Sequence, residues 1–189
     1  MSDDGRRHDD LAAPEWPALE SEVEYETGWV TGGYDLVEQP DGTTKRYYWA
    51  ELATAVVVVA VQDGSVVFVE QYRPTVRETQ FELPAGVVEA GESFTAAAER
   101  ELAEETGFAA GSTALLQDFW VATGLLRHRR GFVFATDLEP VEPDLDDNEF
   151  LSVRSVPVGE ALDVARSQPT NDATLEGILL AREDEFLPE

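Results

Sequence analysis

The segment from Ser93 to Thr106 constrains the fold of this 189-residue chain more than any other. It is rich in alanine and glutamate, contains neither glycine nor proline, and is followed by Gly107, so it predicts a helix ending at that glycine. On a helical wheel of about 100° per residue, the apolar residues gather on one side. They are Phe94, Ala97, Ala98 and Leu102. The helix must therefore lie against a hydrophobic layer.

Glutamates occupy the second half of the same stripe. Glu101 and Glu105 fall on the inward side and Glu104 lies beside it, whereas a solvated acidic face would lie opposite. Carboxylates held together repel one another unless a cation neutralises them, and hard oxygen ligands suit Mg²⁺ or Mn²⁺. Arg100 lies four residues before Glu104 and is placed to pair with it. The helix predicts a divalent metal site, with Arg100 either catalytic or a structural partner.

The rest of the chain predicts a mixed sheet flanked by helices. Turn sequences at residues 39–42 and 62–64 indicate hairpins over 28–52 and 54–72. Val56–Val59 are continuously apolar, so we expect a strand buried on both faces. Three further strands are expected over 113–121, 132–138 and 151–156, and two helices over 158–167 and 172–186. This order predicts an α/β (α+β) sandwich. We expect a flexible acidic tail over 1–20, a hairpin subdomain over 21–53 and the main domain over 54–189.

The charge and the cysteine count exclude several classes of protein. The chain has 39 acidic and 13 basic residues, a formal net charge of -26, and we expect it to bind no nucleic acid. Having no cysteine, it forms no disulfide, thiolate metal site or thiol nucleophile. It has no apolar run of membrane-spanning length and no signal-peptide pattern. We therefore expect a cytoplasmic protein with no membrane partner.

The residues around the helix follow a known signature. Their order and spacing are Gly86, Glu92, Arg100-Glu101-Leu102, Glu104-Glu105 and Gly107-Phe108. This segment resembles the Nudix box of the Nudix hydrolase superfamily, with Phe108 as a mild variant at a hydrophobic position. The resemblance covers roughly residues 25–180.

The resemblance implies a Nudix-type α/β/α sandwich with a mixed sheet, and hydrolysis of a diphosphate linked to a nucleoside. Glu101, Glu104 and Glu105, helped by the backbone carbonyl of Ala85, would bind two or three Mg²⁺ or Mn²⁺ ions. These ions would clamp the diphosphate and activate the attacking water. Arg100 is a candidate catalytic residue in the same segment.

The substrate is suggested by a second resemblance. Glu70-Gln-Tyr-Arg73 followed by Glu82-Leu-Pro-Ala-Gly86 looks like the ADP-ribose pyrophosphatase branch, where an arginine like Arg73 meets the diphosphate and a glutamate like Glu82 lies near metal and substrate. Gly86 would let the backbone approach the substrate closely. We expect hydrolysis of ADP-ribose to AMP and ribose 5-phosphate. The alternatives are a nucleotide sugar, NADH, a dinucleoside polyphosphate or a nucleoside triphosphate as substrate, or a sensor that binds a nucleotide without cutting it.

The hairpin over residues 28–52 also resembles that branch, in which it helps to form a dimer and contributes to the nucleoside site. We therefore expect a homodimer. Trp29 and Trp49, with Tyr47 and Tyr48, are candidates for stacking on the base. Packing within the hairpin or the dimer is the alternative for each of these aromatic residues.

One segment departs from the branch. Thr123 stands where the branch has proline, and basic residues near Arg127 and His128 replace its acidic pair. We expect a basic loop in which Arg127 and Arg129 clamp a phosphate, with Arg130 beside them and His128 titrating near neutral pH. Salt bridges to the acidic surface are the alternative. An acidic loop in the branch often supplies a catalytic base, and Glu149 is the candidate here.

The acidic composition generates a first prediction. If it is an adaptation to a salty cytoplasm, the free energy of unfolding will be higher in molar KCl than in low salt, because screening weakens repulsion among the carboxylates. Urea unfolding curves at the two salt concentrations measure this. Equal stability in both would contradict the adaptation and leave a surface that serves solubility alone.

Overall fold

The computed structural model describes residues 15–145, 150–167 and 169–188. Its chain divides into two compact units. One unit ends at Leu52 and also takes in Gly124–Leu126, and the other comprises Ala53–Thr123 and the chain from Arg127 onward. The boundary between Leu52 and Ala53 lies next to the one that we expected after residue 53. None of the helices in the described ranges is long and apolar enough to cross a membrane.

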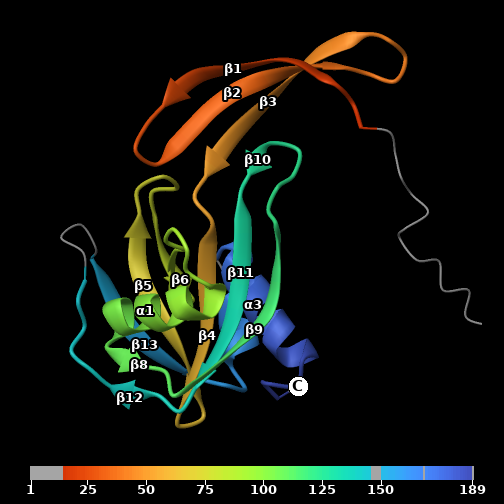
Figure 1. Cartoon of the computed structure of the whole chain (residues 1–189). Helices are drawn as coiled ribbons and strands as arrows, with labels where there is room; N and C mark the ends of the chain where they lie inside the picture. Colours follow the sequence, from red (N-terminus) through yellow and green to blue (C-terminus); the bar gives the residue numbers. More distant parts are fainter. Residues whose placement is uncertain (1–14, 146–149, 168, 189) are drawn as a thin grey trace, which may run out of the picture. The chain divides into compact units, whose positions relative to one another are not determined.

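In the smaller unit β1, β2 and β3 form an antiparallel sheet, and β10 follows β3 in the strand order (Figure 1). Its strands are β1 (Ala18–Glu26), β2 (Val30–Glu38), β3 (Thr44–Leu52) and β10 (Leu126–Arg127). The expected hairpin is β2-β3, closed by a turn in which the Gly42 amide donates to the Gln39 carbonyl at 2.9 Å. Strand β1 was not predicted, and Ala18–Glu20 belong to it rather than to the tail. Most of that tail, residues 1–14, lies outside the described residues.

The larger unit is built on a seven-stranded mixed sheet. The strand order is β13-β5-β4-β11-β9, with β6 paired to β5 and β7 paired to β4, and β4 and β11 are parallel. Its strands are β4 (Ala55–Gln62), β5 (Ser65–Arg73), β6 (Glu78–Glu82), β7 (Ala85–Val87), β9 (Ser112–Trp120), β11 (Arg129–Thr136) and β13 (Leu151–Pro157). A separate pair joins β8 (Phe108–Ala109) to β12 (Glu139–Pro140).

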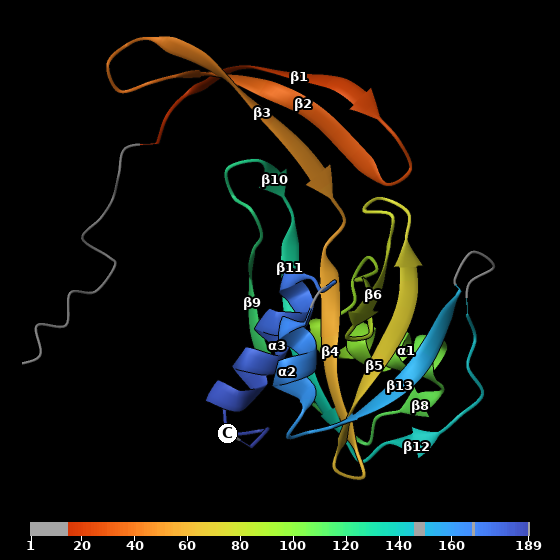
Figure 2. The same cartoon turned by 180° about the vertical axis from the view of Figure 1, so that it is seen from behind.

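Helices cover both faces of this sheet. Helix α1 (Phe94–Thr106) lies on one face, and α2 (Ala161–Arg166) and α3 (Asp172–Glu183) lie on the other (Figures 1 and 2). The two hydrophobic layers take alternate residues of β4: Val57 and Val59 pack with the α2–α3 layer, while Val56 and Val58 pack with α1. The four valines are at most 2% exposed, which confirms a strand buried on both faces. The predicted α/β/α sandwich is thus the observed fold.

The helix ends follow local capping rules. The Ser93 hydroxyl accepts from the Ala96 amide, and Gly107 adopts a left-handed conformation with φ of 69°, so α1 has the predicted limits. Helix α2 begins at Ala161 rather than at residue 158, because a turn from Pro157 to Glu160 precedes it. Helix α3 is capped by Asn171 and begins at Asp172 as predicted, but it ends at Glu183 instead of Phe186.

Candidate functional site

The buried face of α1 carries glutamates in its C-terminal half, as the helical wheel predicts. Glu101 and Glu105 are only 8% and 5% exposed, on the side of the buried Ala97, Ala98 and Leu102. The Ala85 amide donates to Glu105 Oε2 at 3.1 Å, which ties the helix to the segment before it. The carboxylates therefore face protein and not bulk solvent.

Gly86 makes this arrangement sterically feasible. A Cβ atom at this position would lie 1.9 Å from Cδ of Glu101 and 2.1 Å from each of its carboxylate oxygens. No real Cβ atom tolerates such a contact, so the Glu101 carboxylate occupies the space that only glycine leaves free. The glycine thus serves the approach of a glutamate to the backbone.

Arg100 offsets part of the negative charge of the glutamates on and before α1. Its Nη1 donates to Glu101 Oε1 at 2.8 Å and to Glu104 Oε2 at 2.9 Å, which includes the i,i+4 pair that we expected. Its Nε and Nη2 each reach an oxygen of Glu92 at 3.1 Å, and Nη2 also donates to the Val87 carbonyl at 2.8 Å. The hydrogen bonds to Glu92 are the largest cause that raises the pKa of Arg100, and the same contact lowers the pKa of Glu92. The geometry supports the structural role; catalysis by Arg100 stays a prediction.

The donor chemistry of this cluster fits a hard divalent cation. Three carboxylates lie within five positions of one helix, next to the Ala85 backbone. Within the described ranges, however, no three acidic or histidine side chains already converge as a ready metal centre. Arg100 holds one oxygen of Glu101 and one of Glu104 instead.

Glu82 and Arg73, each predicted as a substrate-binding residue, contact one another. Glu82 is 5% exposed, and its Oε2 accepts from Arg73 Nε at 2.9 Å and from Arg73 Nη2 at 2.6 Å. Gln71 Nε2 donates to the same oxygen at 2.8 Å, and Asn171 Nδ2 donates to Oε1 at 2.7 Å. Neither Gln71 nor Asn171 was among the predicted site residues. Alternation along β5 places Gln71 on the face of Arg73 and was an available signal for the former.

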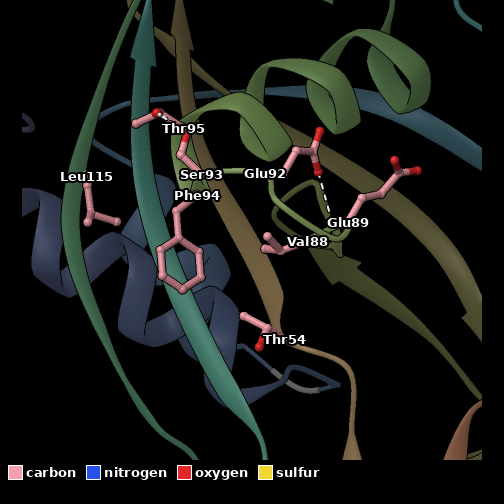
Figure 3. A pocket seen from close by; sticks show the side chains of 8 residues that line it. All are labelled: Thr54, Val88, Glu89, Glu92, Ser93, Phe94, Thr95 and Leu115. Atoms are coloured by element: carbon pink, nitrogen blue, oxygen red, sulfur yellow. Dashed lines mark hydrogen bonds between the residues drawn. The ribbon is translucent and has the colours of Figure 1, made fainter.

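A cavity of about 310 Å³ opens beside these residues. Arg73, Glu82, Ala85 and Gly86 contribute to its wall, together with residues from β11 and α3. A larger cavity of about 580 Å³ lies by the start of α1 (Figure 3). Of the box glutamates it contains only Glu92, which accepts a hydrogen bond from the Glu89 backbone and is held by Arg100. The wall of the smaller cavity contains none of the box glutamates, but it contains the Arg73–Glu82 pair and the Ala85–Gly86 backbone, against which Glu105 and Glu101 pack. We therefore identify the smaller cavity as the candidate active site.

The prediction of a loop around Arg127 is wrong, because the basic residues lie in or next to strands. Arg127 closes the short strand β10, which lies next to β3 in the strand order. Arg129 and Arg130 begin β11, which pairs with β9. Arg129 forms an ion pair with Asp118, and Arg130 Nη1 lies 3.2 Å from Asp172 and 3.5 Å from Glu176. These are the salt bridges of the alternative interpretation. Of the three arginines, Arg130 is the one that lines the candidate cavity, and the phosphate clamp by Arg127 and Arg129 stays a prediction.

His128 also lines the cavity, but it is nearly buried. Its Nδ1 lies 2.8 Å from the Ala53 carbonyl, which can only accept, so the ring donates through Nδ1. Burial lowers the pKa of His128 below its usual value, so the ring is neutral at pH 7. Burial moves the titration of His128 to the acid side of its usual range, and titration near neutral pH stays a prediction.

The remaining predicted site residues are Trp29, Trp49 and Glu149. Trp29 and Trp49 belong to the smaller unit, where Trp29 is 76% exposed and Trp49 Nε1 donates to Asp35 at 3.1 Å. The Trp49 contact matches the packing alternative, and base stacking stays a prediction for both. The homodimer also stays a prediction. Glu149 lies outside the described residues.

Comparison with known proteins agrees with the site. The family model of the NUDIX domain matches residues 51–176. The chain belongs to the Nudix family. It is 34% identical to the ADP-ribose pyrophosphatase of Bacillus subtilis over 140 residues, 72% of this chain and 76% of that protein. It is 33% identical to the ADP-ribose pyrophosphatase of Mycobacterium tuberculosis over 150 residues, 77% of this chain and 72% of that protein.

A solved structure shows the same fold. A crystal structure of an ADP compounds hydrolase superposes with a TM-score of 0.83, covering 90% of this chain and 94% of that one at 24% identity. The chain is a Nudix pyrophosphohydrolase. Hydrolases of this family use divalent metal ions.

The contact between Gly86 and Glu101 generates a prediction. Gly86→Ala will displace the Glu101 carboxylate and raise the concentration of Mg²⁺ needed for half-maximal activity by about 10-fold or more, as for lost support of a metal ligand. A Mg²⁺ titration of the initial rate measures this. Gly159→Ala is the matched control, because a Cβ atom there meets nothing within 4 Å. An unchanged Mg²⁺ requirement in Gly86→Ala would show that Glu101 does not contribute to the metal site.

Proposed function

We propose that this chain hydrolyses ADP-ribose to AMP and ribose 5-phosphate in the presence of Mg²⁺. The observation that carries the proposal is that one cavity is lined both by the predicted diphosphate-binding pair and by the backbone that supports the predicted metal ligands. The Arg73–Glu82 pair lies there with the Ala85–Gly86 backbone, against which Glu101 and Glu105 of α1 pack. Two relatives that match most of this chain are named ADP-ribose pyrophosphatases, which supports this substrate.

Each residue has a distinct part in this proposal. Glu101, Glu104 and Glu105, with the Ala85 carbonyl, would hold two or three Mg²⁺ ions, which offset the charge of the diphosphate and lower the pKa of the attacking water. Arg73 contacts the diphosphate, and its partner Glu82 fixes the direction of its guanidinium group. The water oxygen bonds to one phosphorus, and the bond from that phosphorus to the bridging oxygen breaks. The bridging oxygen leaves on the second phosphate, and the proton of the water is released.

Arg100 is assigned a supporting part. It contacts Glu92, Glu101 and Glu104 at once, so it can hold the helix and the preceding loop together while offsetting one of their three negative charges. Because an arginine stays protonated throughout the accessible pH range, it is suited to charge compensation and not to proton transfer.

A substrate panel tests the proposed substrate. ADP-ribose, ADP-glucose, GDP-mannose, NADH and 8-oxo-dGTP are compared with Mg²⁺ present, and the released phosphomonoester is measured. We expect the highest kcat/KM with ADP-ribose. A higher value with another compound would replace ADP-ribose as the substrate, and binding of ADP-ribose without turnover would indicate a sensor.

The role of the inward glutamates is tested by a pair of variants on one helix. Glu105→Gln is expected to lower kcat by orders of magnitude while the thermal midpoint stays close to that of the wild type, because the fold loses only one ligand charge. Glu99→Gln makes the same chemical change on the exposed face, where Glu99 only accepts from the Thr113 hydroxyl, and should leave kcat unchanged. Similar kcat values in the two variants would contradict metal binding by Glu105.

A further inference from the structure

The Glu82 carboxylate is held by donors on both of its oxygens. Oε2 accepts from Gln71 and from two nitrogens of Arg73, at distances between 2.6 and 2.9 Å. Oε1 accepts from Nδ2 of Asn171 at 2.7 Å. Glu82 is 5% exposed, so water can replace little of this network if a donor is lost. A buried carboxylate that lacks a donor is costly, and its side chain then favours another position.

Asn171 is itself fixed from the other side. Its Oδ1 accepts from the Thr174 amide at 2.8 Å, which is the N-cap contact of α3. With the oxygen committed to an N–H group, the amide nitrogen must face the Glu82 carboxylate. The Thr174 hydroxyl in turn accepts from the Leu83 amide at 3.2 Å, one residue after Glu82. Two hydrogen bonds thus attach the start of α3 to Glu82, the last residue of β6, and to Leu83 after it.

An ordinary helix cap does not account for this arrangement. A serine or aspartate at position 171 would cap α3 equally well through a side-chain oxygen. An ionised aspartate has no donor for Glu82, and a serine would have to make both contacts through its single oxygen. The asparagine amide offers an acceptor to the helix and, on a separate atom, a donor to Glu82. The second hydrogen bond is therefore what asparagine adds beyond capping.

We propose that Asn171 is a positioning residue for substrate binding, acting through Glu82 on Arg73. It fixes Oε1 of Glu82, so that Oε2 stays aligned with the Nε and Nη2 atoms of Arg73. Arg73 is then presented to the cavity in one orientation, although its side chain is 45% exposed and otherwise free to move. The inference rests on the proposed contact between Arg73 and the diphosphate. Asn171 acts before chemistry, so it affects KM and not kcat.

Asn171→Ser tests the proposal, because serine keeps the cap and is too short to reach Glu82. We expect KM for the diphosphate substrate to rise by about 10-fold, the size expected for loss of a hydrogen bond to a charged group, with little change in kcat. Thr170→Val is the matched control. It removes the 2.9 Å hydrogen bond from Thr170 to the Ala165 carbonyl, next to Asn171, without touching Glu82, and should leave KM unchanged.

A double-mutant cycle separates positioning from general damage. In an Arg73→Ala background, Asn171→Ser should change KM by less than about twofold, because the residue through which it acts is gone. A similar rise in both backgrounds, or no rise in the wild-type background, would overturn the proposal. Calorimetric titration of the same four proteins with ADP-ribose reports binding without turnover. If the wild type binds ADP-ribose but does not cut it, the proposed function fails, while the coupling between Asn171 and Arg73 is still measured.

Discussion

The burial of acidic side chains on the inner face of α1 is the constraint on which the rest of the site depends. Glu101 and Glu105 lie where a helix normally places apolar residues, so each needs a compensating contact. The Ala85 amide supplies one for Glu105, and Arg100 supplies one for Glu101. Close packing of Glu101 against Gly86 then fixes where the loop before the helix runs. The need to compensate the buried carboxylates of α1 thereby determines the course of the backbone at Ala85 and Gly86.

The segment from Glu82 to Gly86 connects α1, on one face of the sheet, to α3 on the other face. At one end it meets α1 through Ala85, and at the other it meets the start of α3 through Glu82 and Leu83. These contacts join residues separated by 20 to 91 positions in the sequence. Because such hydrogen bonds hold together elements from both layers of the sandwich, loosening α3 also affects residues that face the cavity.

Features governed by neighbouring residues could be predicted from the sequence, and features governed by distant pairing could not. Ser93 and Gly107 delimit α1 by local capping, and four consecutive valines identify β4. Strand β1 was missed although its glutamates alternate with Leu19, Ser21, Val23 and Tyr25 at the period of a strand. Every one of its residues is exposed, so no buried face marks it, and it is defined by its pairing with β2. The segment around Arg129 was taken for a loop because only its pairing with Trp120 on β9 makes it a strand. The link from Asn171 to Glu82 spans 89 positions, and no local pattern in the sequence indicates it.

The strongly negative net charge of the chain opposes the approach of an anionic diphosphate, so the site needs local positive charge to bind it. A diphosphate approaches a chain of net charge -26, and the two arginines that line the cavity are already paired, Arg73 with Glu82 and Arg130 with Asp172. Their attraction for an anion is therefore reduced, and divalent ions on α1 would supply the missing positive charge. Salt screens the distant surface carboxylates far more than it screens contacts inside the cavity. High ionic strength thus lowers the long-range barrier to an anionic substrate while leaving the short-range contacts largely intact, which makes an acidic surface compatible with a phosphate-binding site.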